Sequence, residues 1–195
     1  KYTNSWASFD LEKECADALI SDGCVLISQH ADTTGAPTAC EAKKVPCVGY
    51  NIDMIPTAPD AALTSATINW GPYYTYAVQS VIDGTAIETD WAKGVKDGAD
   101  AITELNDKTV AEGTKEEVEE AQKGIEDGTI HVFDTSKFTV GGKTLEELVE
   151  SGDEDATKLQ SYIKDGYFHE SDVESGMPSA PAFTFIIDGI NSITK

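Results

Sequence analysis

One stretch decides the fold that we expect from this sequence: Cys24-Val25-Leu26-Ile27-Ser28-Gln29-His30-Ala31-Asp32-Thr33-Thr34-Gly35. The apolar run over residues 24–27 has the length and the β-branched content that are typical of a buried parallel strand. A polar run follows without transition, and Gly35-Ala36-Pro37 then opens a helical segment. The pattern predicts a strand that feeds a polar loop lying over the N-terminus of a helix.

The polar loop is a candidate ligand site. In open α/β sheets, ligands bind at the carboxyl ends of the strands, where such loops gather. The hydroxyl groups of Thr33 and Thr34, the carboxylate of Asp32 and the free N–H groups of the helix can all form hydrogen bonds with a polar ligand. Alternatively, these residues only cap the helix that follows. The local sequence leaves both interpretations open.

Helical and strand patterns alternate around this stretch. In order, they predict a helix over residues 8–22, a strand over 24–28, a helix over 37–43 and a strand over 46–50. This alternation is typical of right-handed βαβ units, so we expect an α/β fold with a parallel sheet flanked by helices. The second strand also runs into polar residues. Asn51 and Asp53 should therefore lie at the same edge of the sheet as Asp32 and Thr33.

The remainder of the chain carries further signals. Two capping boxes, which begin at Thr114 and Thr144, predict the starts of a helix that ends near residue 127 and of a shorter helix. The other predicted elements are a β-prone segment over 63–68, a helix over 70–83, an extended segment over 91–105, a short strand over 129–133, a hairpin-like turn within 138–143, a helical turn over 159–163 and a strand over 181–190. We expect the last of these to return and cover the sheet.

Composition excludes several classes of function. The 195 residues suffice for one large or two small domains, and a hydrophobic content of 40% is enough to build a core. The net charge is -21, and all 14 basic residues are lysines. Because such an acidic surface repels the phosphate backbone of nucleic acids, we do not expect this chain to bind nucleic acid. No apolar run approaches the length of a membrane helix.

The four cysteines, Cys15, Cys24, Cys40 and Cys47, all lie in the first quarter of the chain. No Cys-x-x-Cys spacing occurs and no histidine follows at zinc-ligand distance, so we expect no metal site. Two disulfides can form in three pairings, and Cys24 and Cys47 would face each other because each opens an apolar strand. Alternatively, all four are buried thiols that act as small apolar side chains.

Catalytic motifs are missing from the sequence, which has no GxSxG, HExxH, P-loop or GxGxxG pattern. His30 is the only histidine in the candidate pocket, and Cys24 opens an apolar strand, where a thiol is inert. Paired carboxylates are uninformative in so acidic a chain. We therefore expect neither catalytic residues nor a cofactor, and an α/β enzyme that uses Asp32 and His30 is the weakest of the alternatives.

An ordered series of motifs resembles one protein family. The motifs are Thr3-Asn4-Ser5-Trp6, Gln29-His30-Ala31-Asp32, Val48-Gly49-Tyr50-Asn51-Ile52-Asp53-Met54, Leu63-Thr64-Ser65, Asn69-Trp70-Gly71-Pro72-Tyr73-Tyr74, Asp83-Gly84-Thr85, Lys96-Asp97-Gly98, Lys164-Asp165-Gly166-Tyr167-Phe168, Ser179-Ala180-Pro181-Ala182-Phe183 and Ile187-Asp188-Gly189-Ile190. They cover nearly the whole chain in order. On these motifs the chain resembles the basic membrane protein (BMP, or PnrA-like) family of substrate-binding lipoproteins of ABC transporters.

The resemblance implies a type I periplasmic-binding-protein-like fold, in which two α/β lobes joined by a hinge close on a ligand. Residues 1–67 would form the C-terminal lobe, residues 68–110 would cross into the N-terminal lobe, and residues 111–195 would return to the C-terminal lobe and form the tail. The match begins at the first strand of the second lobe, so we expect the C-terminal portion of a longer protein. Such a half of a cleft should bind ligand more weakly than the intact protein.

The resemblance also implies a function. Members of the family bind purine nucleosides and hand them to a membrane permease. We therefore expect an extracytoplasmic solute-binding protein of an ABC importer, anchored to the membrane as a lipoprotein in its full-length form. Its partners would be a nucleoside-like small molecule and the permease. An extracellular ligand-sensing module of the same fold is the alternative.

Ligand-binding residues follow from the matched motifs. They are Trp6, Asp32, Thr33, Thr34, Asn51, Asp53, Trp70 and Lys96. The first loop would face the cleft, Asn51 and Asp53 would lie opposite sugar hydroxyls, the two tryptophans would offer stacking surface, and Lys96 would approach from the N-terminal lobe. The family often has Gly-x-Asp-x-Asp where this chain has Gly49-Tyr50-Asn51-Ile52-Asp53. Asn51 both donates and accepts hydrogen bonds, whereas a carboxylate only accepts them.

Overall fold

The computed structural model describes residues 1–169 and 178–193 of the 195-residue chain. The chain divides into two compact units. Unit 1 consists of Lys1–Trp70, Gly98–Glu120 and the end of the chain from Ser192, and unit 2 consists of Gly71–Asp97 and Ala121–Asn191. Among the described residues, none of the helices combines the length and the apolar composition that a membrane span requires.

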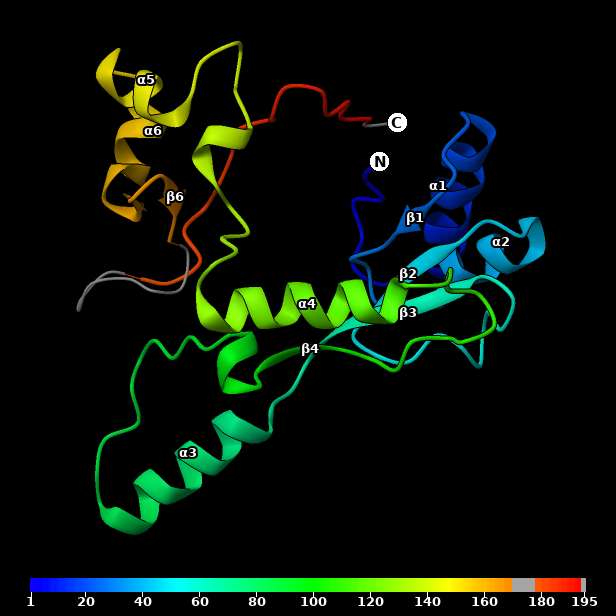
Figure 1. Ribbon diagram of the computed structural model, residues 1–195, viewed down its shortest axis with the longest axis horizontal. Coiled ribbons are helices and arrows are strands. Elements are labelled where there is room, and N and C mark those ends of the chain that lie inside the picture. Colours follow the sequence, from blue (N-terminus) through cyan, green and yellow to red (C-terminus); the bar gives the residue numbers. More distant parts are fainter. Residues whose placement is uncertain (170–177, 194–195) are drawn as a thin grey trace. The chain divides into compact units, whose positions relative to one another are not determined.

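A four-stranded sheet lies at the centre of unit 1 (Figure 1). Its strands, in spatial order, are β1 (Ile27–Ser28), β2 (Cys47–Tyr50), β3 (Ala62–Ile68) and β4 (Asp100–Ile102). The first three run parallel, and β4 is antiparallel to β3. Helices α1 (Phe9–Ser21) and α2 (Gly35–Lys43) flank the sheet and pack against each other. The predicted α/β class, with a mostly parallel sheet flanked by helices, is confirmed.

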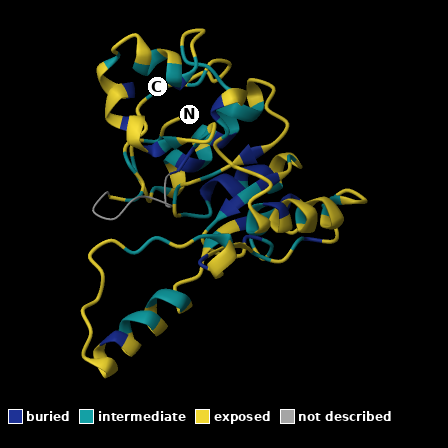
Figure 2. Cartoon of the chain, turned by 60° about the vertical axis from the view of Figure 1, so that its left-hand side comes forward, coloured by how far each residue is buried: buried dark blue, intermediate teal, exposed yellow. Residues whose placement is uncertain are grey.

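Small side chains build the core of unit 1. Its buried cluster contains Ala16, Ile27, Ala36, Ala39, Cys40, Cys47, Met54, Ala58, Ala61 and Ala62. Figure 2 shows buried residues gathered in the sheet and the adjoining helices. Small residues let these elements approach closely: a Cβ added at Gly35, the first residue of α2, would lie 2.3 Å from the carbonyl oxygen of Phe9 in α1. Gly35 therefore allows α2 to begin directly against α1.

The first strand is shorter than the sequence predicts. β1 contains only Ile27–Ser28, and Val25, which was expected to be buried, is 81% exposed. The N–H groups of Gly23 and Cys24 donate to carbonyl groups in the last turn of α1, each at 3.0 Å, and Gly23 adopts a φ of 96°. These bonds form a Schellman motif, which closes the helix. Cys24 therefore completes the cap of α1 instead of opening a strand.

The cysteines match neither prediction in full. All four are free thiols, so neither of the two possible disulfides is formed in this structure. Cys40 and Cys47 are buried, Cys15 is half-buried and Cys24 is exposed. Cys24 is exposed because it belongs to the helix cap. The alternative of four buried thiols is thus right for Cys40 and Cys47 and wrong for Cys24.

Three further helical segments follow the predictions in part. They are α3 (Gly71–Asp83), the 3₁₀ turn η1 (Val95–Asp97) and α4 (Thr114–Asp127). α3 and α4 form as expected, whereas the segment predicted to be extended over residues 91–105 holds both η1 and β4. At the start of α4, Thr114 is already helical, and the N–H of Glu117 donates to the carbonyl of Gly113 at 3.1 Å. That backbone bond takes the place of the first predicted capping box.

Unit 2 has a small core of its own. Its other elements are η2 (Thr135–Lys137), α5 (Leu145–Glu150), α6 (Glu154–Leu159), η3 (Gln160–Tyr162) and the antiparallel pair β5 (Ile163–Lys164) and β6 (Tyr167–Phe168). Leu145, Leu159, Tyr162 and Phe168 form its buried cluster. The second capping box is confirmed, because the Thr144 hydroxyl accepts the N–H of Glu147 at 3.2 Å and the Glu147 carboxylate accepts the N–H of Thr144 at 2.9 Å.

Two predicted strands of unit 2 are wrong. Residues 129–133 and 181–190, all within the described ranges, form no strand. The tail is held by Asp188, whose carboxylate accepts hydrogen bonds from the Thr139 hydroxyl at 2.6 Å and from the N–H groups of Gly141 and Gly142 at 2.9 and 2.8 Å. These glycines form the predicted hairpin turn, with φ values of 59° and 79°. One backbone bond, from the N–H of Asp188 to the carbonyl of Thr139 at 2.8 Å, adds to these contacts. The Asp188 side chain and this single bond, and not a ladder of backbone bonds, therefore fix this part of the tail.

Candidate ligand-binding site

Two polar loops leave the sheet of unit 1 at one edge. β1 and β2 are parallel neighbours, with Ser28 paired with Val48. The chain after each strand therefore emerges on the same side, and we call these segments loop A (residues 29–34) and loop B (residues 51–53). Loop B begins at Asn51, which has a φ of 66° and whose N–H donates to the carbonyl of Ala66 in β3 at 2.6 Å. The strand register confirms that the two strand ends meet at one edge.

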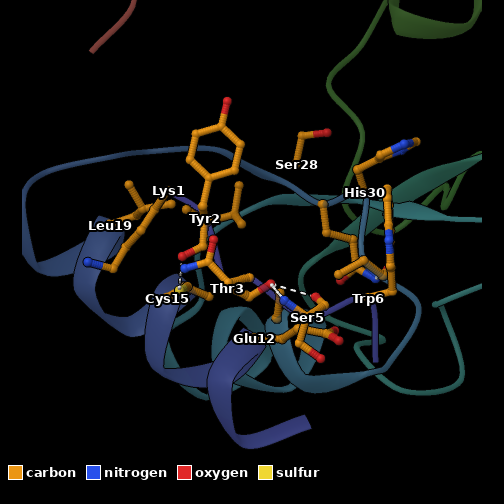
Figure 3. A pocket seen from close by; sticks show the side chains of 16 residues that line it. Lys1, Tyr2, Thr3, Ser5, Trp6, Glu12, Cys15, Leu19, Ser28 and His30 are labelled. Atoms are coloured by element: carbon orange, nitrogen blue, oxygen red, sulfur yellow. Dashed lines mark hydrogen bonds between the residues drawn. The ribbon is translucent and has the colours of Figure 1, made fainter. Parts of the chain in front are cut away.

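Three aromatic side chains, Trp6, His30 and Tyr50, form a surface beside loop A that we call the aromatic shelf. The ring centroids of Trp6 and His30 lie 5.6 Å apart, and those of His30 and Tyr50 lie 4.7 Å apart. Trp6 and His30 lie next to each other in Figure 3, and Trp6 is 68% exposed. The Trp6 carbonyl accepts the N–H of Asp32 at 2.8 Å, which ties the shelf to loop A. Such a surface suits a flat ring, because aromatic groups stack on one another.

A pocket of about 530 Å³ adjoins the shelf, within the size range of small-molecule sites (Figure 3). It is lined by residues 1–6, by one side of α1 and by the chain that follows β1. Gln29 lines it too, and its Nε2 donates to the carbonyls of Ala31 and Thr33 at 2.9 Å each. Its Oε1 is buried and has no hydrogen-bond partner among the described residues.

Glu12 holds loop A in place through hydrogen bonds from Thr33. This residue lies in α1, is 3% exposed, and its carboxylate accepts the Thr33 hydroxyl at 2.6 Å and the Thr33 N–H at 3.2 Å. It also accepts the N–H of Ser8 at 3.1 Å. Sequence reasoning missed this role. The available signal was its position four residues before Ala16, on the buried face of α1.

The predicted residues of loop A divide between two roles. Asp32 is exposed at the sheet edge, whereas the Thr33 hydroxyl donates to the buried Glu12 and accepts the N–H of Gly35 at 3.2 Å. Thr34 occupies the N-cap position of α2, although in this described part of the chain its side chain makes no capping bond. The capping interpretation therefore applies to Thr33, and Asp32 remains oriented to solvent.

The other predicted residues lie in three places. Asn51 and Asp53 of loop B are exposed, and one Asp53 carboxylate oxygen accepts the N–H of Ile55 at 2.9 Å. Trp70 is 53% exposed and follows the end of β3, which runs parallel to β2. Lys96 lies in η1, within unit 2. The structure thus brings Asp32, Asn51 and Asp53 to one edge of unit 1, together with the aromatic shelf.

Metal-binding chemistry finds no support in the described residues, which contain no group of three His, Cys, Asp or Glu side chains that could hold an ion. The donors and acceptors of the edge are carboxylates, an amide and backbone groups beside aromatic rings. This combination can bind an uncharged polar molecule that carries both a flat ring and hydroxyl groups.

Sequence comparison identifies relatives among transport proteins. A family model described as "ABC transporter substrate-binding protein PnrA-like" matches residues 1–134. A purine-binding protein of Brucella abortus is 32% identical over 132 residues, which are 68% of this chain and 37% of that protein. A putative ABC transporter glucose-binding protein of Haloferax volcanii is 25% identical over 138 residues, 71% of this chain and 35% of that protein. The chain thus spans little more than a third of the length of these relatives.

Structure comparison supports the fold. A solute-binding protein of an ABC transporter from Conexibacter woesei matches with a TM-score of 0.52 at 18% identity, over 68% of this chain and 45% of that one. A protein described as a transcriptional activator of the comK gene from Bacillus halodurans matches with a TM-score of 0.59 at 16% identity, over 68% of this chain and 47% of that one. The family match confirms the resemblance for the motifs within residues 1–134, and the three motifs beyond residue 134 stay predictions. The chain belongs to the PnrA-like family of ABC transporter substrate-binding proteins.

Proposed function

We propose that this chain carries one wall of the ligand site of an extracytoplasmic solute-binding protein, which delivers a purine nucleoside or a related small polar molecule to the permease of an ABC importer. The family match supports the transport role, and the purine-binding protein of Brucella abortus supports the ligand class. Anchoring to the membrane as a lipoprotein is part of the same proposal.

The juxtaposition of the aromatic shelf with loops A and B carries this proposal. A purine base would stack on Trp6, whose ring is mostly exposed. The ribose hydroxyls would then donate to the carboxylates of Asp32 and Asp53, and the Asn51 amide would both accept and donate hydrogen bonds. Thr33 would act indirectly, because its hydroxyl is bound to Glu12. Thr34, Trp70 and Lys96 remain proposed contacts on the strength of the matched motifs.

The division of the chain supports a two-lobe arrangement. We propose that residues 1–67 belong to the C-terminal lobe and that residues 68–110 cross into an N-terminal lobe. Unit 2 takes over from unit 1 at Gly71 and gives way at Gly98, inside this crossing segment. α3 also presents exposed apolar side chains, of which Val78 is 59% and Val81 71% exposed. A second lobe that covers α3 would remove this apolar surface from water. The same division groups residues 121–191 with residues 71–97, so it gives no support to the return of residues 111–195 to the C-terminal lobe, which stays a prediction.

A thermal-shift screen tests the ligand class. The chain should be screened against adenosine, guanosine, inosine, ribose, glucose and amino acids. A ligand at a hundredfold excess over its dissociation constant adds about 2.7 kcal/mol of stability, so purine nucleosides should raise the melting temperature. Trp6→Ala should weaken nucleoside binding roughly 5- to 150-fold, because base stacking contributes roughly 1–3 kcal/mol.

A matched control separates recognition from folding. Val25→Ala truncates an apolar side chain that is 81% exposed and lies outside the shelf and both loops, so its affinity should equal that of the wild type. A screen in which glucose raises the melting temperature and no nucleoside does so would replace the purine proposal with a sugar ligand. Equal nucleoside affinity of Trp6→Ala and Val25→Ala would remove the stacking role of Trp6.

A further inference from the structure

His30 contacts both of the other rings of the aromatic shelf. Its ring centroid lies 5.6 Å from that of Trp6 and 4.7 Å from that of Tyr50, and the ring planes are inclined by 70° and 55°. Because the imidazole does not stack on the indole, it leaves a face of Trp6 open, and Trp6 is 68% exposed. His30 is itself exposed and lines the pocket (Figure 3). The stacking role of Trp6 in the proposed function makes no use of the His30 ring.

The two nitrogens of the His30 ring are available to a ligand. In the part of the chain that the structure describes, neither nitrogen has a hydrogen-bond partner. The preceding residue differs in this respect, because the Gln29 amide donates to the carbonyls of Ala31 and Thr33 at 2.9 Å each. A neutral imidazole has one N–H donor and one acceptor nitrogen. His30 therefore presents unused hydrogen-bonding groups on a ring that its aromatic neighbours hold in place.

We propose that His30 determines the specificity of the ligand site for purines, by donating a hydrogen bond to N7 of a base that is stacked on Trp6. This inference rests on the proposed function. Aromatic rings that pack against each other have centroids about 4.5–7 Å apart. A base on Trp6 would thus lie about as close to the indole as His30 does, at 5.6 Å, and the edge of the base would lie beside the imidazole.

N7 is the acceptor that natural purines share on their open edge. Adenine and guanine both have an acceptor at N7, but at position 6 adenine has an amino donor and guanine has an oxygen acceptor. Ribose is attached at N9, so N7 stays accessible in a nucleoside. One N–H donor at N7 therefore suits both purines, whereas uridine and cytidine have no atom that takes the place of N7. The contact would select purines as a class.

The other polar groups near the shelf are less suited to this contact. The carboxylates of Asp32 and Asp53 only accept hydrogen bonds, so they cannot bind the acceptor N7. The Trp6 N–H lies in the plane of its own ring, so it cannot point at a base that is stacked on the face of that ring. Tyr50 contacts the ring of His30, and among the described residues no ring contact joins Tyr50 to Trp6. His30 is therefore the side chain of the shelf that has a donor beside the stacking surface.

A double-mutant cycle that pairs a protein variant with a ligand analogue tests this role. His30→Phe keeps an aromatic ring against Trp6 and Tyr50 but removes both nitrogens, and 7-deaza nucleosides replace N7 by a C–H group. Isothermal titration calorimetry gives the dissociation constants of adenosine, guanosine and their 7-deaza analogues for both proteins. With the wild type, each analogue should bind about 2- to 10-fold more weakly than its parent, as the loss of one hydrogen bond between neutral groups requires. With His30→Phe, parent and analogue should bind equally well.

A control variant and the wild type itself separate the possible outcomes. Val25→Ala lies outside the shelf and both loops, so it should keep the wild-type ratio between parent and analogue. A ratio of one in the wild type, or the same ratio in the wild type and in His30→Phe, overturns the role of His30 while the proposed function stands. A wild type that binds no purine nucleoside overturns both. If His30→Phe does not fold, His30→Ala truncates the same exposed side chain and allows the same comparison.

Discussion

Replacing Glu12 with alanine should destabilise unit 1 and release loop A. The substitution removes the acceptor of three hydrogen bonds, two from Thr33 and one from the N–H of Ser8, at a position that is 3% exposed. Hydrogen bonds to a charged group contribute about 1.5–3 kcal/mol each. The alanine variant avoids the free energy needed to bury a carboxylate, which offsets part of that loss. We therefore expect a net loss of about 3 kcal/mol in the free energy of unfolding.

Urea denaturation measures this loss. For a chain of this size the denaturant slope is about 2 kcal/mol per molar urea, so the midpoint should fall by about 1.5 M. Glu12→Gln keeps one acceptor oxygen but turns an amide N–H₂ toward N–H donors, so it should lose roughly half as much. Glu14→Ala is the matched control, because Glu14 is an exposed carboxylate in the same helix. Its midpoint should stay near that of the wild type.

A double-mutant cycle distinguishes the hydrogen bonds from general packing. Thr33→Val removes the hydroxyl and keeps the shape of the side chain. In the wild-type background it should be clearly destabilising. In the Glu12→Ala background its effect should be clearly smaller, because the acceptor of the hydroxyl is already gone and only the bond from the Gly35 N–H remains to be lost. Equal effects of Thr33→Val in both backgrounds, or a midpoint for Glu12→Ala that matches Glu14→Ala, would refute the reasoning.

Two further predictions concern packing and the tail. Gly49→Ala would place a Cβ 2.4 Å from the Cγ of the buried Met54, so overpacking should lower the stability by about 1–3 kcal/mol in urea denaturation; a loss below about 0.5 kcal/mol would contradict this. The hydroxyl of Thr139 and two hairpin N–H groups hold the pKa of Asp188 below its usual value. The stabilisation is therefore complete above the ordinary aspartate pKa of about 4 and is lost as the pH falls through the lower folded value. Hydrogen-exchange protection of the Gly142 amide should fall over that range, and Asp188→Asn should lower it at every pH; unchanged protection would be inconsistent with this role.

The alternation of helix and strand could be predicted from sequence because it depends on local apolar patterns. The helices over 8–22 and 37–43 and the strand over 46–50 lie within two residues of α1, α2 and β2. The prediction that the first strand begins at Cys24 was wrong, because β1 begins at Ile27. The pattern of apolar residues does not show the helix cap that causes this difference. The backbone at Gly23 caps α1, and the N–H of Cys24 donates to the carbonyl of Leu19 in the helix instead of to a neighbouring strand. Val25 therefore lies outside the sheet and is exposed, although it is apolar. When the same residues could either cap a helix or extend a strand, the hydrogen bonds of their N–H groups determine which of the two structures forms.

Side-chain chemistry at a distance was harder to predict. The tail over residues 181–190 has the alternation of a strand, but the Asp188 carboxylate and a hairpin about 45 residues earlier hold it in place. Such a contact leaves no periodic signal. The two capping boxes make the same point at short range: the motif at Thr144 forms, whereas at Thr114 the helix starts earlier and a backbone bond replaces it.

Loop A shows why a polar loop cannot be read as a binding site from composition alone. Asp32 and Thr33 are adjacent and equally polar, but the structure gives them opposite roles. The Gln29 side chain donates hydrogen bonds to carbonyl groups within the loop, and the Thr33 hydroxyl donates to Glu12. These two residues therefore fix the shape of the loop. Asp32 is tied to the Trp6 carbonyl by its N–H and leaves its carboxylate exposed. A loop that is already fixed by internal hydrogen bonds loses less conformational entropy when a ligand binds. Thr33 and Gln29 should therefore affect ligand affinity through the rigidity of the loop, and Asp32 should affect it through direct contact.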